Sequence, residues 1–188
     1  MYTKVFTASA TLLTLALAAL QTQADDPPAK DAEKTRAVDV AGIQFTVPES
    51  WKSLKPSSAM RKSQIQVQPI EGDKAPAELV LFVFPGGAGS VQANVERWRN
   101  QFTDANGAHP EVESKTVKGQ NVEVTRVEAA GSYKDPFAAD GPHENYRLLG
   151  AIVTTEDTGY FFKMVGPDKT MKAATEAFDK MLSTIKTQ

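Results

Sequence analysis

Three segments of the chain are apolar at nearly every position, so that both alternating sets of side chains are hydrophobic. They are residues 79–84 (LVLFVF), 148–153 (LLGAIV) and 160–165 (YFFKMV), the last interrupted only by Lys163. Successive side chains of a strand point to opposite faces of the sheet, so strands of this composition must be covered on both faces. We therefore expect three central strands, with a further layer on each side of the sheet.

Two weaker patterns predict additional strands. Residues 64–68 alternate Ile and Val with Gln, which is typical of a strand with one buried and one solvated face. Residues 36–47 alternate on either side of Ala41-Gly42. We expect two short strands joined by a turn there, and Pro48 ends the second because proline cannot donate to a strand ladder.

One further strand pattern contains a fault in its alternation. Val122 and Val124 fall on one face of an extended strand, whereas Val127 and Ala129 fall on the other. A β-bulge at Thr125–Arg126 would reconcile the two pairs, because an extra residue reverses the side to which later side chains point. A strand that changes its pairing partner at this point is the alternative.

Two amphipathic helices can supply the covering layers. The first begins at Ser90, a typical N-cap, and carries Val91, Val95, Trp98 and Phe102 on one stripe. We expect this stripe to lie on the sheet and to bury Trp98.

The second helix begins at Pro167-Asp168, with the Asp168 carboxylate as the expected N-cap. Its apolar positions also share one stripe: Met171, Ala174, Phe178, Met181, Leu182 and Ile185. Strands and helices together predict an α+β fold, a mostly antiparallel sheet of about six strands flanked by helices.

The stretch FPGGAGS, residues 84–90, joins a strand to a helix through three glycines. A P-loop needs a Lys after its last glycine. A dinucleotide-binding loop instead needs a small residue at the position of Gln92. Neither is present, so we expect the glycines to serve the turn itself and Ser90 to cap the helix.

The N-terminal residues have the layout of a secretory signal peptide. Lys4 precedes an uncharged run rich in Leu and Ala, and Thr22-Gln23-Ala24 fits a cleavage site. We expect a signal peptide over residues 1–24, a disordered spacer over 25–35 and a single globular domain over 36–188. Retention of the first segment as a membrane anchor is the alternative; no transmembrane segment is expected after cleavage. The protein is then periplasmic or secreted, and without cysteine it has no disulfides.

Composition excludes several classes of function. The formal net charge is −2, which gives no electrostatic basis for binding nucleic acid. The chain has no Cys and two His, so it offers few of the residues that nucleophilic catalysis or a metal site requires. We expect no cofactor and no metal.

Candidate site residues are therefore few. The segment from Gly131 to Asn145 (GSYKDPFAADGPHEN) reads as a long irregular connection, which is often functional when ordered. It contains the main polar cluster, and two further groups could form a ligand or partner surface. The candidates are Asp135, Asp140, His143 and Glu144 in the connection, and Trp51, Arg97 and Arg99 outside it.

The stretch GIQFTVPESW resembles the F-x-x-P-x-x-W opening of the PsbP-like superfamily. The closing FFKMVGP and AFDKMLSTIK are similar to the last strand, turn and helix of the same group, which includes photosystem extrinsic subunits, a Ran-binding import factor and periplasmic bacterial relatives. The resemblance implies an antiparallel sheet in an α/β/α sandwich used for binding, and it brings no catalytic residue to this chain. We expect an exported, non-enzymatic protein that binds a partner protein or a small ligand. A carboxylate-dependent hydrolase using the 131–145 segment and a structural protein of the cell envelope are the alternatives.

Overall fold

The computed structural model describes Met1 and residues 33–188. Apart from Met1, the predicted signal peptide lies outside the described residues, as does the predicted spacer up to residue 32. The first strand begins at Thr35, inside the segment predicted as spacer, because Thr35 already pairs with Pro48 in a strand ladder. The folded part of the chain therefore begins before the predicted Arg36.

Residues 33–188 form two sheets and two helices. The strands are β1 (Thr35–Val40), β2 (Ile43–Pro48), β3 (Lys52–Leu54), β4 (Arg61–Val67), β5 (Ala77–Pro85), β6 (Phe102–Thr103), β7 (Glu113–Lys118), β8 (Glu123–Tyr133), β9 (His143–Thr154), β10 (Thr158–Pro167) and β11 (Lys186–Thr187). The helices are α1 (Val91–Arg99) and α2 (Asp168–Thr184).

The larger sheet has eight strands in the order β3-β4-β5-β10-β9-β8-β6, with β7 also paired to β8. The smaller sheet has the order β1-β2-β11. Every strand pair in the described residues is antiparallel. The predicted antiparallel α+β architecture is confirmed, although the predicted number of about six strands was too low, because short or exposed edge strands leave little hydrophobic pattern.

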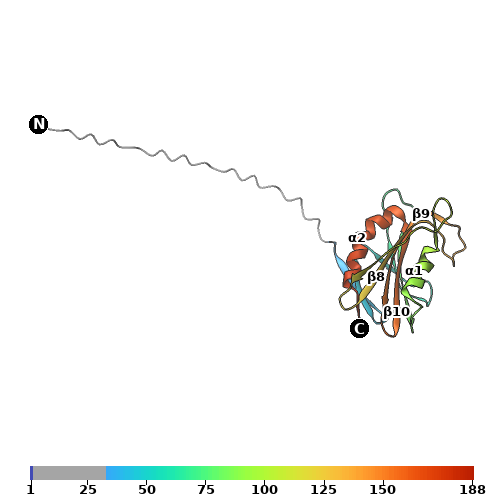
Figure 1. Cartoon of the computed structure of the whole chain (residues 1–188), viewed down its shortest axis with the longest axis horizontal. Helices are drawn as coiled ribbons and strands as arrows, with labels where there is room; N and C mark the ends of the chain where they lie inside the picture. Colours follow the sequence, from blue (N-terminus) through green and yellow to red (C-terminus); the bar gives the residue numbers. More distant parts are fainter. Residues whose placement is uncertain (2–32) are drawn as a thin grey trace. The chain divides into compact units, whose positions relative to one another are not determined.

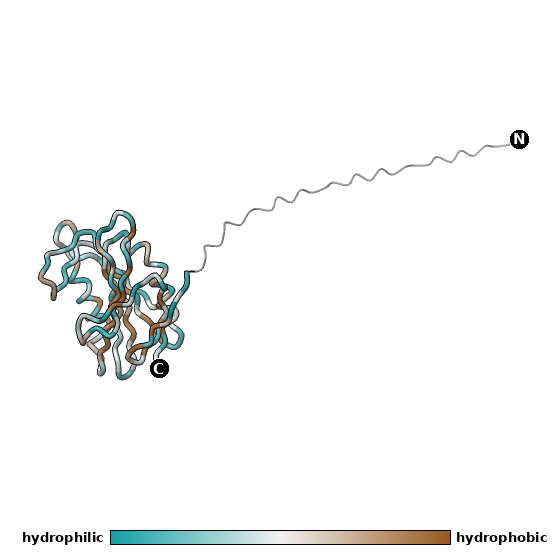
Figure 2. Tube along the Cα trace, turned by 180° about the vertical axis from the view of Figure 1, so that it is seen from behind, coloured by the Kyte–Doolittle hydropathy of each residue, from teal (hydrophilic) through white to brown (hydrophobic). Residues whose placement is uncertain are grey.

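The three strands predicted to be central, β5, β10 and β9, are neighbours in the middle of the larger sheet. Figure 1 shows α1 and α2 on opposite sides of β8, β9 and β10, and the hydrophobic residues concentrate along the middle of the fold in Figure 2. We call the two sides of this sheet the α1 face and the α2 face. Each helix covers one of the two apolar surfaces that these strands present.

Two hydrophobic clusters occupy the two faces. On the α2 face, Phe162 belongs to the same cluster as Phe178 of α2 and packs edge-on against Phe45 of β2, with ring centroids 5.0 Å apart. On the α1 face, Trp98 packs with Phe102 and Phe161. Trp98 is 6% exposed, as its position on the helical stripe predicted.

Helix α1 is shorter than its apolar stripe suggested. Ser90 is the N-cap, as predicted, and its side chain accepts a hydrogen bond from the Ala93 amide at 3.1 Å. The helix ends at Arg99, and Phe102 reaches the same cluster from β6 instead. In the preceding turn Gly86, Gly87 and Gly89 have φ of 80°, 83° and 84°, so the expected role of these glycines in the turn is confirmed.

The predicted bulge at Thr125–Arg126 is wrong, because β8 pairs regularly with β7 and β9 through this point. Val124 and Val127 do point to opposite faces, and both are fully buried because each face of the sheet is covered. The alternation fault in the sequence therefore reflects a strand that is buried on both sides.

The predicted N-cap of α2 is also wrong. Pro167 occupies the N-cap and has no capping side chain. Asp73, which lies far away in the sequence, accepts hydrogen bonds from the amide and the hydroxyl of Thr170, both at 2.7 Å. A free N–H group of the first helical turn is thus satisfied by a tertiary contact.

Candidate functional site

A β-bulge interrupts the pairing of β8 with β9 at one end of the α1 face. Gly131 pairs with Tyr146 and Tyr133 with His143, so two residues of β9 stand opposite one residue of β8. One of the two is Asn145, whose φ of 57° lies in the left-handed region. The extra residue changes the alternation of β9, so that His143 and Tyr146 both come to lie on the face that carries Tyr133.

The bulge produces a row of aromatic rings on this face. The His143 ring stacks on Tyr146 with centroids 5.0 Å apart, and Tyr146 lies parallel to Tyr133 at 6.2 Å. Tyr133 in turn contacts Phe102 at 5.1 Å. The row therefore leads from the half-buried His143 into the apolar cluster under α1.

Lys163 lies beside this row, in the middle of the central strand β10. It pairs with Val80 of β5 and Gly150 of β9. Its half-buried ammonium donates hydrogen bonds to Gln101 Oε1 at 2.6 Å and Tyr133 Oη at 3.0 Å. Neither acceptor is charged, and no carboxylate of the described residues lies within 4 Å of the ammonium. We call Lys163, Gln101, Tyr133, His143 and Tyr146 the Lys163 cluster.

Protonation in the cluster is shifted by its surroundings. Burial lowers the pKa of Lys163 to about 8, and the positive charge of Arg61 acts in the same direction, while Asp135 opposes it. Burial raises the pKa of Tyr133, and Asp135 adds to this shift. Burial also raises the pKa of Tyr146. Several shifted groups in one place are typical of functional sites.

Part of the predicted irregular connection is regular structure. Strand β8 continues to Tyr133 and β9 begins at His143, so only residues 134–142 form a loop. In this loop Asp135 accepts a hydrogen bond from the Phe137 amide at 2.9 Å, and Asp140 lies 3.0 Å from His143 Nε2. The proposed extent of 131–145 was therefore too long, because the strand pairing extends through glycine and asparagine at the bulge.

The predicted acidic and histidine candidates separate into two groups. His143 belongs to the Lys163 cluster, Asp140 holds its ring, and Asp135 acts electrostatically on Lys163 and Tyr133. Glu144 is exposed and accepts a hydrogen bond from the Ser132 hydroxyl at 2.9 Å, so it takes no part in the cluster.

The candidates outside this segment lie elsewhere. Trp51 is 5% exposed and packs in the cluster on the α2 face, so it offers no surface for stacking and the predicted ligand surface at Trp51 is wrong. Arg97 is exposed and donates to Asn94 Oδ1 at 2.7 Å. Arg99 donates to the Pro110 carbonyl and pairs with Glu96, so it fastens the end of α1 to the segment that follows.

Sequence reasoning missed four members of the Lys163 cluster: Lys163, Gln101, Tyr133 and Tyr146. One signal was available, since Lys163 is the single charge in an otherwise apolar central strand. The hydrogen-bond partners of Lys163 could not be predicted from the sequence. Gln101 and Tyr133 are far from it in the sequence, and the bulge that brings Tyr146 into line has no distinct pattern.

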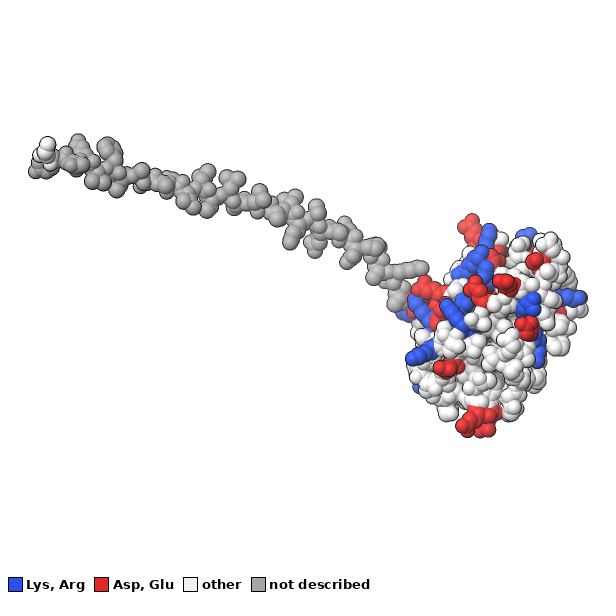
Figure 3. Space-filling view, in the orientation of Figure 1, with Lys and Arg blue, Asp and Glu red and all other residues white. Residues whose placement is uncertain are grey.

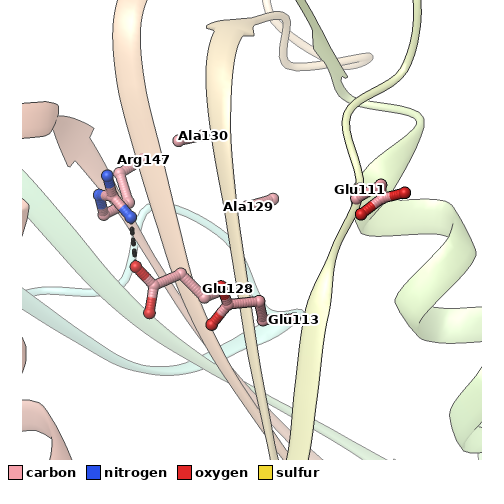
Figure 4. Close-up of a pocket in the computed structure, with 6 residues that line it drawn as sticks. All are labelled: Glu111, Glu113, Glu128, Ala129, Ala130 and Arg147. Atoms are coloured by element: carbon pink, nitrogen blue, oxygen red, sulfur yellow. Dashed lines mark hydrogen bonds and ion pairs between the residues drawn. The ribbon is translucent and has the colours of Figure 1, made fainter.

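A second polar group lies on the α2 face and joins α2 to the sheet. Arg126 bonds Asp179 of α2 at 2.6 Å and Glu128 at 2.8 Å, and Arg147 bonds both Glu128 and Asp168. Figure 4 shows Arg147 bonded to Glu128, with Glu113 beside Glu128 on the neighbouring strand. Acidic and basic side chains are interspersed over the surface in Figure 3, as this alternation of charge suggests.

This ionic group has the properties of a structural contact. Burial alone would lower the pKa of Arg126, but hydrogen bonds to Asp179 and Glu128 outweigh it and raise the pKa. Burial would raise the pKa of Asp168, and Lys172 and Arg147 instead lower it. Arg126 and Asp168 are thus held in their ionised forms by their neighbours. Residues 33–188 contain no group of three or more His, Asp or Glu side chains placed to hold a metal ion.

An antiparallel sheet between helices on its two faces defines the fold as PsbP-like. The solution structure of cyanobacterial PsbP (CyanoP) from Synechocystis sp. PCC 6803 matches 87% of this chain and 98% of that chain, with a TM-score of 0.53 and 12% sequence identity. The predicted PsbP-like fold is confirmed, and at this identity the likeness is one of fold. No protein-family model and no curated protein sequence matches the chain.

The shifted pKa of Lys163 predicts a rise in stability with pH between about 8 and 10. In this window the folded protein has lost the Lys163 proton, whereas the unfolded chain keeps it up to a pKa of about 10.4. The unfolded state then binds more protons, so the free energy of unfolding increases with pH. Above about pH 10 Tyr133 reverses the trend, because its pKa is raised in the folded state and the unfolded chain loses that proton first.

Urea denaturation at half-unit intervals from pH 7 to 10.5 measures this dependence. We expect the rise to disappear in Lys163→Met, which keeps the length of the side chain and removes the amine. A rise of the same size in Lys163→Met would show that another group is responsible.

Proposed function

We propose that the protein is an exported, non-enzymatic binding protein whose ligand presents an anionic group, such as a carboxylate, to Lys163. The observation that carries the proposal is the half-buried ammonium of Lys163, whose two hydrogen-bond acceptors are both neutral. The anionic group belongs either to a small ligand or to an acidic side chain of a partner protein.

The chemistry of the ammonium supports an anionic ligand. An ammonium has three donors, and Gln101 and Tyr133 accept two of them. A charge removed from water is costly unless it is paired, and an anion would supply a charge-assisted hydrogen bond. The stacked rings of Tyr146 and His143 form an adjacent flat surface for the remainder of a ligand.

The N-terminal sequence supports export. Its single Lys, apolar run and Thr22-Gln23-Ala24 fit a cleavable signal peptide. In the part of the chain that the structure describes, no helix combines the length and apolar character needed to cross a bilayer. A binding protein delivered beyond the membrane fits both observations.

The hydrolase alternative has less support. A carboxyl group that acts as a general acid needs a raised pKa. Outside residues 131–145, backbone hydrogen bonds from Ala108 and Asn106 lower the pKa of Asp104, and the pKa of Asp168 on the α2 face is also lowered, so neither has the raised pKa of a general acid. Asp135 and Asp140 have separate partners, the Phe137 amide and His143. The separate partners of Asp135 and Asp140 favour binding as the function of the α1 face.

Titration with succinate and citrate at pH 7 and pH 9 tests the proposal. We expect saturable thermal stabilisation at pH 7 that weakens about tenfold at pH 9, because an amine of pKa about 8 goes from mostly charged to mostly neutral. The response should be absent in Lys163→Met. It should persist in the control Lys180→Met, because the side chain of Lys180 is 75% exposed on α2.

Ordinary surface lysines keep their charge at pH 9, so the pH profile separates the Lys163 cluster from non-specific binding. An equal response in Lys163→Met, or an affinity unchanged between pH 7 and pH 9, would contradict the proposal.

A further inference from the structure

A hollow of about 550 Å³ lies at the end of the larger sheet beside the start of α1. Strands β7, β8 and β9 contribute Thr116, Thr125 and Ile152 to its wall, and these three residues are consecutive partners across the strands. Thr154 lies two residues beyond Ile152 on the same face, and Val91 of α1 closes one side. The hollow falls within the range of about 300–1,000 Å³ typical of small-molecule sites.

Its lining has a distinct chemistry. The hydroxyls of Thr116, Thr125 and Thr154 make no hydrogen bond to any other described residue. Half-buried Val91 and Val122 add apolar surface, Ile152 is buried beneath the threonines, and no Lys or Arg lines the hollow. A hydroxyl both donates and accepts hydrogen bonds, so this surface suits a ligand that carries neutral hydroxyls and also presents C–H groups.

The rim of the hollow is held in place. Asn121 donates to the Thr187 carbonyl and accepts from the Thr187 amide, each at 3.0 Å, which ties the β7–β8 turn to β11. Thr155 is fixed by hydrogen bonds to Thr158 in the turn between β9 and β10. The three free hydroxyls therefore stand on paired strands between two tethered turns, an arrangement that limits the ordering cost of binding.

We propose that this hollow binds a neutral saccharide. Sugar hydroxyls exchange hydrogen bonds with Thr116, Thr125 and Thr154, and the C–H face of a sugar ring packs on Val91 and Val122. The exposed carboxylate of Glu123, at the edge of the hollow, accepts a further hydrogen bond from a sugar hydroxyl. The site is separate from Lys163, and its ligand is neutral rather than anionic.

Titration of the protein with maltotriose and chitotriose, followed by backbone amide NMR shifts, tests the inference. Maltotriose presents hydroxyls alone, and chitotriose adds neutral acetamido groups. We expect saturable shifts centred on Thr116, Thr125 and Thr154 with at least one of the two. Thr125→Val and Thr154→Val each remove one hydroxyl while keeping a β-branched side chain suited to a strand, so each should weaken binding about fivefold.

Thr35→Val, at the start of β1 and outside the hollow, is the matched control and should bind as the unchanged protein does. The inference is overturned if neither saccharide gives a saturable shift at millimolar concentration. It is also overturned if the Thr125→Val/Thr154→Val double variant binds equally well. None of these variants alters Lys163, so this result and the carboxylate response are independent of each other.

Discussion

Replacing Trp98 with alanine is expected to lower the free energy of unfolding by about 3–5 kcal/mol, the usual cost of removing a large buried aromatic side chain. Trp98 is 6% exposed and fills the space between α1 and the sheet. Its ring lies directly over Gly150, where an added Cβ would come within 2.3 Å of the indole Cζ3. The loss is a large share of the roughly 5–15 kcal/mol that keeps a domain folded.

Denaturant unfolding monitored by far-ultraviolet circular dichroism measures this loss, because the signal does not depend on tryptophan fluorescence. Arg97→Ala is the control on the same helix, since Arg97 is exposed, and it should change stability by about 0.5 kcal/mol or less. Gly150→Ala should also destabilise the protein, and by less in the Trp98→Ala background, because the clash is then relieved. Unchanged stability of Trp98→Ala would mean that the indole does not support the α1 face.

Replacing Arg126 with methionine is expected to cost about 2 kcal/mol. Arg126 is 4% exposed and is the link between Asp179 of α2 and Glu128 of β8. Removing one member of a buried ionic group typically costs about 3–5 kcal/mol because its partners are left unpaired. The cost is smaller here, since Glu128 keeps Arg147 as a partner and the side chain of Asp179 is 41% exposed to water.

Equilibrium unfolding in urea compares this variant with Lys180→Met. Lys180 pairs with Glu176 on the outer side of α2, where the two side chains are 75% and 73% exposed, so that variant should differ by about 0.5 kcal/mol or less. Equal stability of Arg126→Met and the unchanged protein would show that apolar packing alone holds α2 on the sheet.

Much of the fold could be predicted because buried positions produce a regular pattern of hydrophobic residues in the sequence. The runs that became β5, β9 and β10 are apolar at consecutive positions, which requires cover on both faces, and the structure places them at the centre of the sheet. The apolar stripe containing Trp98 likewise identified the buried face of α1, because its hydrophobic residues recur at helical spacing. Four edge strands were not predicted. In β3, β6 and β11 two or three residues are too few to show a period, and in β7 five of the six residues are exposed, so no hydrophobic period exists.

The sequence by itself determined that β5, β9 and β10 are buried on both sides, where α1 begins and which glycines turn the chain, because these depend on neighbouring residues. Only the tertiary structure decided the cap of α2, the bulge between β8 and β9, and the partners of Lys163. Asp73 and Thr170 are 97 residues apart in the chain, and Lys163 and Gln101 are 62 apart. Contacts between such distant residues depend on strand register and on the path of the chain, and they leave no local pattern. The Lys163 cluster follows from that geometry, because a lysine in an apolar strand becomes a candidate site when a bulge and a neighbouring strand bring polar groups to it.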